Sequence, residues 1–271
     1  MESTVRLSSF CTLATAATLC SAPAMAATVD ALSLIQSYNA IALEDFTMSS
    51  SHVEGTMYVG GDLNFQNDTD VNGDGQVPSV LGGALVVGGD VIGPAPSSEM
   101  RVLNGDASIG GSANGHVKMN GGGTLTEGAS VPTTDVAEAM IGLSALLASL
   151  DATVGASYDN SDPNAPITLG SGNADGYAVL DLNAADGASF LAGNLNTLDT
   201  TGFAGVFINI AGASLTHTGN WNAQANNVIL NFYEATTFGH TNGNLNYSVL
   251  APLADVTNGG SGMNGFLVGK T

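Results

Sequence analysis

Two stretches in the first third of the chain repeat each other without a gap, and this repeat constrains the fold more than any other feature. "VEGTMYVGGDL" (53–63) and "LGGALVVGGDV" (81–91) align at an offset of 28 residues, and looser copies occupy 103–113 and 113–123. In the two best copies, alternating apolar residues are followed by a pair of glycines. The alternation predicts a half-buried strand, and the glycine pair predicts a corner where the backbone needs a positive φ angle.

Short strands that end at glycine and recur at irregular spacing predict a mainly β fold. The gapless repeat favours a β-solenoid, in which the strands of successive coils stack on one another. An antiparallel sandwich with glycine-rich turns stays open as the alternative. Strand patterns return at 176–182, 205–210, 227–235 and 245–256. We therefore predict one β-solenoid-like domain over residues 27–271.

One long segment has a helical period instead. Residues 133–150 place apolar side chains at i, i+3 and i+4, which is typical of an amphipathic α-helix. The predicted apolar stripe consists of Val136, Ala139, Met140, Leu143, Leu146, Leu147 and Leu150. Because such a stripe needs a partner surface, we expect the helix to pack alongside the solenoid. A shorter helix is predicted within residues 30–38, with Asp30 as its N-cap.

The first 26 residues are typical of a secretory signal. Arg6 supplies a positive charge, a modestly apolar stretch follows, and the small-x-small sequence "AMA" predicts cleavage after Ala26. Both cysteines, Cys11 and Cys20, lie within this segment. The exported protein is therefore expected to fold without disulfides and to act outside the cell or at its surface.

The charge of the chain restricts its partners. The formal net charge is −20, and only Arg101, Lys118 and Lys270 remain as fixed positive charges after the signal. Nucleic-acid binding is excluded because a phosphate backbone needs several basic residues to neutralise it. Anionic lipids and polyuronates are disfavoured for the same reason. The expected partners are an extracellular glycan, a protein surface or a second copy of the chain, with membrane contact only through a separate anchor.

Two long stretches resemble a known family. "YNAIALEDFTMSSSHVEGTMYVGGDL" (38–63) resembles the opening of the choice-of-anchor A domain, a bacterial adhesive domain. "NVILNFYEATTFGHTNGNLNYSVLAPLADVTNGGSGMNGFLVGK" (227–270) resembles the end of that family, in which an N-F-x-x-A-T strand leads to an x-L-A-P-x-A-x-V strand. This end is also similar to the closing coil of bacterial ice-binding β-solenoids, which carry a long helix alongside. The resemblance implies an adhesive role. Covalent anchoring is not expected, because no LPxTG-like motif or apolar tail precedes Thr271.

An acidic stretch within "QNDTDVNGDGQVPS" (66–79) resembles a calcium loop. Oxygen-bearing side chains alternate, and Gly73 follows at the sixth position of the loop template. Position twelve is Ser79, which lacks the bidentate carboxylate, so the predicted calcium site is weak and structural. The alternative is a solvated turn, because the same residue types form tight turns. The predicted ligands are Asp68, Asp70, Asn72 and Asp74.

The sequence offers little for catalysis. The histidines show no metal-ligand spacing and are expected to be exposed or at strand corners; they are His52, His116, His217 and His240. Acid pairs such as Asp181 and Asp186 are expected by chance in a chain with 24 acids. We therefore predict a non-enzymatic adhesive or matrix protein, with a glycan-active β-helix enzyme as one alternative.

Ice binding is the other alternative. It would require regular threonine ladders, and the sequence offers two fragments, "TLT" (124–126) and "LTHT" (215–218), without a repeated register. Three aromatic residues fit either a binding patch or the hydrophobic core; they are Trp221, Tyr233 and Tyr247.

Overall fold

The computed structural model divides the chain into two compact units. Ala27–Ile141 and Phe266–Thr271 form the first unit, and Gly142–Gly265 belong to the second. The single domain predicted for residues 27–271 stays a prediction. The predicted signal sequence lies outside the described part of the chain, which comprises residues 29–49, 52–76, 78, 80–162, 166–259 and 262–271.

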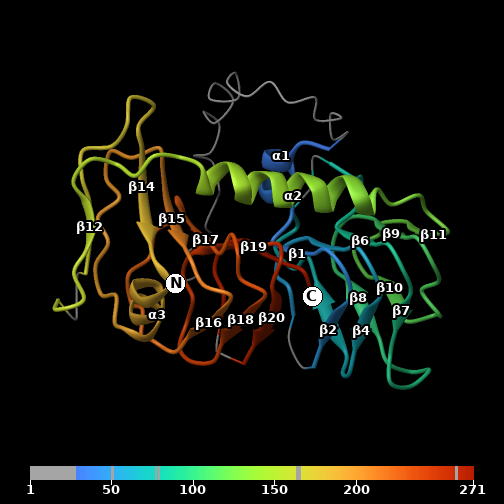
Figure 1. The fold of residues 1–271 in the computed structure, drawn as a ribbon. Coiled ribbons are helices and arrows are strands. Elements are labelled where there is room, and N and C mark those ends of the chain that lie inside the picture. The colour runs from blue at the N-terminus through green and yellow to red at the C-terminus, as the bar shows by residue number, and fades with distance from the viewer. Residues whose placement is uncertain (1–28, 50–51, 77, 79, 163–165, 260–261) are drawn as a thin grey trace. The chain divides into compact units, whose positions relative to one another are not determined.

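The first unit is built from short parallel strands (Figure 1). Its largest sheet has the neighbour order β11–β9–β6–β3–β1–β21, and each of these pairs is parallel. A second parallel sheet joins β2, β4 and β7, and a third joins β5, β8 and β10. The strands are β1 (Ala40–Ala42), β2 (Phe46–Met48), β3 (Met57–Val59), β4 (Leu63–Phe65), β5 (Thr69–Val71), β6 (Leu85–Val87), β7 (Val91–Ile92), β8 (Met100–Val102), β9 (Ala107–Ile109), β10 (Val117–Met119), β11 (Leu125–Glu127) and β21 (Leu267–Gly269).

The repeat seen in the sequence corresponds to neighbouring strands of the largest sheet. Strands β3 and β6 pair with Met57 opposite Leu85, which confirms the gapless alignment. The looser copy at 103–113 supplies β9, the next strand of this sheet. The copy at 113–123 supplies β10, which pairs with β8 in a different sheet. This last part of the predicted repeat is therefore wrong.

Both faces of the largest sheet are covered in the first unit. On the outer face, Ile41, Tyr58 and Val86 are buried. The ring of Tyr58 packs edge-to-face against Tyr38, which follows helix α1 (Ala31–Ser37), with 6.2 Å between ring centroids. The Asp30 side chain caps this helix, as predicted. The inner face contributes to one hydrophobic cluster, which includes Met57, Val59, Leu63, Phe65, Leu85, Val87, Met100, Val102 and Ile109.

The glycine pairs stand where successive strands stack too closely for a side chain. A Cβ built on Gly88 would lie far inside van der Waals contact with the carbonyl oxygen of Gly60, and one on Gly89 would meet the Asp62 carboxylate. Neither glycine of the pairs Gly60–Gly61, Gly88–Gly89 and Gly110–Gly111 has a positive φ angle. The predicted positive-φ corner is therefore wrong, and close backbone packing explains these glycines instead.

The aspartates that follow two of these glycine pairs, Asp62 and Asp90, each bind the next repeat. Asp62 Oδ1 accepts a hydrogen bond from the backbone N–H of Asp90 at 2.8 Å. In the same way, Asp45 accepts the N–H of Asp62 at 2.8 Å, and Asp90 accepts the N–H of Ser112 at 2.7 Å. The GGD motif therefore joins successive strands through both its backbone and its carboxylate.

The second unit also contains parallel sheets. One has the order β19–β17–β15–β14, and another has the order β16–β18–β20. Strands β12 and β13 form an antiparallel pair. The bounds are β12 (Ala156–Tyr158), β13 (Ile167–Leu169), β14 (Tyr177–Leu182), β15 (Gly205–Ile210), β16 (Ser214–His217), β17 (Val228–Asn231), β18 (Thr237–His240), β19 (Ser248–Ala251) and β20 (Asp255–Asn258).

Helix α3 (Ala184–Ala192) in the second unit was not predicted. Its signal in the sequence is Asn183, whose side chain accepts hydrogen bonds from the backbone of Ala185 and Asp186. Such an N-cap followed by an acidic first turn is favourable for a helix start. The short apolar pattern behind it was too brief to indicate a helix by periodicity alone.

The long amphipathic helix is confirmed as α2 (Thr133–Ala148), and the boundary between the two units falls within it. The residues of α2 that belong to the second unit accept hydrogen bonds from two asparagines, one on β15 and one on β17. Asn231 donates to the Ser144 carbonyl at 2.9 Å, and Asn209 donates to the Leu147 carbonyl at 2.9 Å. The predicted apolar stripe is wrong at Leu146, which is 45% exposed.

The prediction of a mainly β fold with one long helix is therefore confirmed at the level of class. Strands predominate among the described residues, most sheets are parallel, and three helices are present. This arrangement is consistent with a β-helix. No helix within the described ranges is long and apolar enough to span a membrane.

Candidate functional site

The outward side of the β16–β18–β20 sheet carries polar side chains in register. Side chains alternate along a strand, so every second residue of these strands lies on the same side. The outward positions of β16 and β18 are exposed or half-buried, while Leu215, His217, Phe238 and His240 between them are buried. We call the outward set the hydroxyl face; it consists of Ser214, Thr216, Thr237, Gly239, Asp255 and Thr257.

Strand register arranges the hydroxyl face in two rows. Ser214, Thr237 and Asp255 are opposite one another in one row. Thr216, Gly239 and Thr257 form the other. Neighbouring parallel strands lie about 4.8 Å apart, so each row repeats at that spacing. The face therefore presents four hydroxyl groups at positions set by the strand spacing, with Gly239 and Asp255 at the other two positions.

The hydroxyls are close enough to interact across strands. Thr237 Oγ1 donates to Ser214 Oγ at 2.9 Å. In the second row, Gly239 separates two threonines, and a Cβ at this position would lie 3.6 Å from the Oγ1 atoms of both Thr216 and Thr257. Such a face can form many weak hydrogen bonds with a repetitive partner. Its one carboxylate belongs to Asp255.

Sequence reasoning missed this grid. The strands "SLTH", "TFGH" and "DVTN" begin at residues 214, 237 and 255 and share the same alternation. Because the spacing from 214 to 237 differs from the spacing from 237 to 255, the strands do not align by a fixed period, and the sequence alone gives "LTHT" no repeated register. All three strands place a large apolar residue between two smaller residues, and two of them end in histidine. This shared order is the sequence signal that could have revealed the grid.

Two of the four histidines pair directly behind the hydroxyl face. His217 and His240 are opposite each other in register, their rings stack at 5.0 Å, and their Nδ1 atoms are 2.9 Å apart. Both side chains are fully buried. His116 is buried as well, whereas His52 is exposed. Exposure is therefore wrong for the three buried histidines, whereas the predicted corner position agrees with the structure. His217 and His240 are the last residues of β16 and β18, and His116 directly precedes β10.

Burial determines the protonation of the histidine pair. Desolvation, with a smaller contribution from the neighbouring His240 ring, lowers the pKa of His217 to about 4. Burial also lowers the pKa of His240, and the backbone of Gly243 opposes this shift. Both rings are therefore neutral at pH 7.

The aromatic residues considered from the sequence mostly belong to the core. Trp221 and Tyr247 are buried, and their rings are 5.5 Å apart. Trp221 also contacts His217 edge-to-face, with 4.5 Å between ring centroids. Tyr233 is half-buried. Burial, with the charges of Glu234 and Asp181, raises its pKa.

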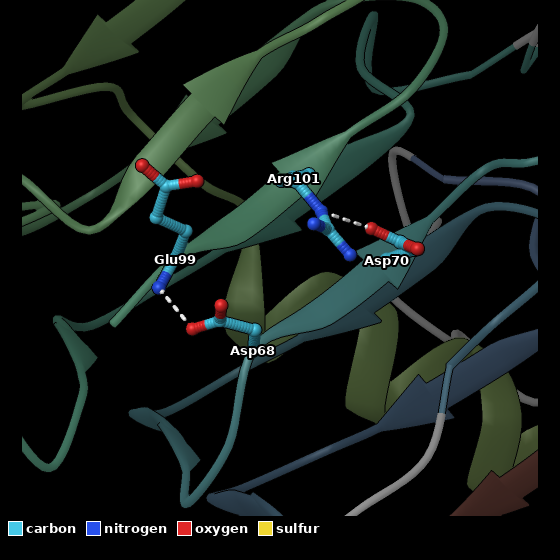
Figure 2. A network of polar contacts seen from close by, with 4 residues as sticks. All are labelled: Asp68, Asp70, Glu99 and Arg101. Carbon is cyan, nitrogen blue, oxygen red and sulfur yellow. Dashed lines mark hydrogen bonds and ion pairs between the residues drawn. The ribbon is translucent and has the colours of Figure 1, made fainter. Parts of the chain in front are cut away.

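Two of the four predicted calcium ligands, Asp68 and Asp70, each contact a residue of the segment that includes strand β8 (Figure 2). Asp68 Oδ1 accepts the backbone N–H of Glu99 at 2.9 Å. Asp70 lies on β5 opposite Arg101 of β8, and its Oδ1 is 2.6 Å from Arg101 Nε. This hydrogen bond and the charge of Asp70 raise the pKa of Arg101. The two aspartates are therefore engaged by the neighbouring strand.

The other two predicted ligands differ from each other in environment. The Asn72 side chain is buried and donates to the carbonyls of Gln76 and Asn104 at 2.8 and 2.9 Å. Asp74 is exposed in the turn. Across the described residues, no group of three or more His, Cys, Asp or Glu side chains is placed to hold a metal ion. Calcium binding by this loop stays a prediction.

Calcium binding by the loop can be tested without disturbing the ion pair between Asp70 and Arg101. If the loop binds calcium, about 10 mM of the ion should raise the melting temperature by about 3 °C. Asp74→Ala should remove that shift, because it deletes an exposed ligand and leaves Asp70 with Arg101. Differential scanning calorimetry with and without a chelator measures both. An unchanged melting temperature in the wild type would identify the loop as an ordinary turn.

The two acids considered as a chance pair are each bound to an asparagine. Asp181 on β14 accepts from Asn209 Nδ2 at 2.8 Å, and Asp186 on α3 accepts from Asn183 Nδ2 at 2.7 Å. The Asp181 carboxylate thereby links strands β14 and β15, and the Asp186 carboxylate binds the N-cap residue of helix α3.

Comparison with known protein families identifies the family of this chain. Residues 31–271 match the family described as "Putative Ice-binding-like adhesive domain". The chain belongs to this family, and the resemblance to adhesive and ice-binding-like proteins is confirmed. No match was found among curated proteins or among solved structures.

Proposed function

We propose that this protein is a non-enzymatic adhesive component, secreted or displayed on the cell surface, that binds its partner through the hydroxyl face. The observation that carries the proposal is the two-row grid of hydroxyls on β16, β18 and β20. Membership of the adhesive family supports the same role.

We further propose that the parallel sheets are faces of a β-solenoid. In the first unit, the chain passes from β3 to β4 to β5, and then repeats the same sequence of sheets as β6, β7 and β8. Parallel in-register pairing between the two passes supports this assignment. A solenoid would give the adhesive a rigid surface whose side chains keep a fixed spacing.

The chemistry of the face favours an extended, repetitive partner that is not strongly acidic. A single hydrogen bond contributes only about 0.5–1.5 kcal/mol net, so useful affinity requires several at once. A rigid grid supplies several without ordering each side chain separately, which lowers the entropic cost of binding. The net charge of −20 would repel an acidic polymer. Neutral glycans on a cell or in a matrix meet these conditions.

The face can be blocked by one protruding charge. Thr216→Lys should reduce retention on cells or immobilised neutral glycans about tenfold, which corresponds to about 1.4 kcal/mol. The long side chain would hold a partner away from Ser214 on the same strand and from Thr257, which lies beyond Gly239 in the same row. Pull-down and biolayer interferometry measure the loss. Thr47→Lys is the matched control, because Thr47 is an exposed threonine in the middle of strand β2 in the other unit.

Three outcomes decide between functions. Equal retention of Thr216→Lys and wild type would exclude the hydroxyl face as the binding surface. The family description and the same grid also favour ice binding as a second function. In that case the wild type inhibits ice recrystallisation and Thr216→Lys does not, and ordinary ice growth with wild type rules it out. Product release from a polysaccharide panel would contradict the non-enzymatic proposal.

A further inference from the structure

The buried histidine pair is held by a hydrogen bond between the two rings, and protonation of both rings would break it. His217 and His240 approach through their Nδ1 atoms, 2.9 Å apart. A neutral imidazole carries one N–H, so one Nδ1 can donate while the other accepts. Protonation of the accepting ring places a proton on both Nδ1 atoms, which then face each other at hydrogen-bond distance. A proton on the Nε2 atom of the donating ring would leave this bond in place, but it would put a charge on a buried ring whose Nε2 atom has no hydrogen-bond partner among the described residues. A second proton would break the bond. The buried site therefore favours the neutral pair.

Among the described residues, no carboxylate is placed to stabilise a protonated ring of the pair. Strand β20 places Asn258 opposite His240, and the ring of Trp221 lies against His217. The remaining titratable groups on elements packed around the pair are engaged or distant along the strand. Asp186 of α3 is bound by Asn183, Glu234 accepts the Gly212 N–H, Asp255 is exposed three residues before Asn258, and the Tyr247 hydroxyl is buried.

The pair lies on the same strands as the hydroxyl face. Thr216 is adjacent to His217 in β16, and Gly239 is adjacent to His240 in β18. The outward row formed by Thr216, Gly239 and Thr257 thus keeps its spacing only while β16 and β18 stay in register. Separation of the two histidines would displace the strands that carry the row.

We propose that the His217–His240 pair is an acid-sensitive lock that holds the hydroxyl face in its binding form and opens it on acidification. The release of the binding partner in acid rests on the function proposed above. The opening of the lock does not, because it is a property of the folded chain alone.

The direction in which pH changes the stability follows from the pKa of histidine in the folded and in the unfolded chain. In the unfolded chain a histidine binds its proton near pH 6.5, whereas burial lowers the pKa of His217 to about 4 in the folded protein. The unfolded state therefore binds more protons between these values, and stability falls as the pH falls from 6.5 towards 4. Above pH 6.5 this contribution does not change.

Trp221 provides the readout. It is the single tryptophan of the chain, and it touches His217. We expect its fluorescence to change in one reversible transition between about pH 5.5 and 4, because a protonated imidazole next to the indole alters its emission. Between pH 7 and pH 4.5, the melting temperature of wild type should fall roughly 5 °C more than that of the variant lacking the pair.

Two variants distinguish protonation of the His217–His240 pair from protonation of other groups in acid. His217→Phe/His240→Phe keeps two aromatic rings in the core and removes both titrating groups, so its fluorescence should be constant through this range. His52→Gln changes an exposed histidine and should retain the wild-type transition. Carboxylates titrate near pH 4 in all three proteins, so a transition that persists in the double variant would overturn the lock.

A measurement on wild type keeps the test valid if the double variant fails to fold. In a histidine NMR titration, the signals of the buried pair should stay unchanged until the Trp221 transition. Titration of both paired rings near pH 6.5 would contradict the proposal.

Surface retention measured over the same pH range tests the release. Loss of retention should coincide with the Trp221 transition. Retention that continues after the transition would overturn acid release. No retention at pH 7, with the transition intact, would instead reject the proposed adhesive function.

Discussion

Gly88→Ala should destabilise the protein by about 3 kcal/mol or more, a large effect for the addition of one methyl group. The new Cβ would be forced against the carbonyl oxygen of Gly60 on the preceding strand. The clash is with backbone, so no side-chain rotation relieves it. The strands would have to separate, weakening the bonds from Gly88 N–H to Val59 and from Gly89 N–H to Gly61, both 2.8 Å long. Urea unfolding measures the loss.

Two alanine substitutions provide the comparison. Gly89→Ala would press on the Asp62 carboxylate and, at 2.9 Å, on the Gly61 backbone. It should therefore also destabilise the protein, but by less than Gly88→Ala, because its closest clash is with a side chain. Gly142→Ala lies in helix α2 with nothing within 4 Å of the new Cβ. It should stabilise by about 0.5–1 kcal/mol, because alanine has the higher helix propensity. Equal effects at Gly88 and Gly142 would contradict the close-packing explanation of the GGD motif.

The parts of the fold that follow from local pattern were predictable. Met57 and Leu85 lie at equivalent places of a gapless repeat, and a parallel sheet puts them opposite each other. Helix α2 showed its period over many residues, so its existence was clear from the sequence. Asp30 was recognised as a cap because capping depends only on residues within one turn.

The features that depend on distant partners were not predictable. Glycine is required both for positive φ and for close backbone approach, and only the stacked neighbour Gly60 reveals which applies to Gly88. The register of β16, β18 and β20 depends on loops of unequal length, which hide the alignment of Thr216 with Thr257. His217 looked like an isolated polar residue because its partner lies on another strand.

The calcium loop illustrates the same limit. Asp68 and Asp70 fit the ligand spacing because a strand also alternates with period two. The structure places Asp70 beside Arg101, a residue 31 positions away that the local pattern does not include. An oxygen-rich stretch can therefore serve strand pairing as well as a cation.

Asn231→Ala should cost about 3 kcal/mol, because this side chain joins the sheet of the second unit to helix α2. Asn231 Nδ2 donates to the Ser144 carbonyl and to Asn209 Oδ1, both at 2.9 Å, and its Oδ1 accepts from Ser144 Oγ at 2.6 Å. All three side chains are buried, so alanine would leave donors and acceptors without partners and away from water. Thermal or urea unfolding followed by circular dichroism measures the change.

A double-mutant cycle separates this ladder from a general packing defect. Ser144→Ala removes one member, and the cost of Ser144→Ala/Asn231→Ala should be at least 0.5 kcal/mol below the sum of the two single costs, a rough threshold for residues in direct contact. Asn242→Ala is the surface control, because this exposed asparagine makes one 3.3 Å bond to the Thr218 carbonyl and should change stability by less than about 0.5 kcal/mol. Strict additivity of the two buried substitutions would show that the helix is held by its apolar residues, with the asparagine ladder contributing little.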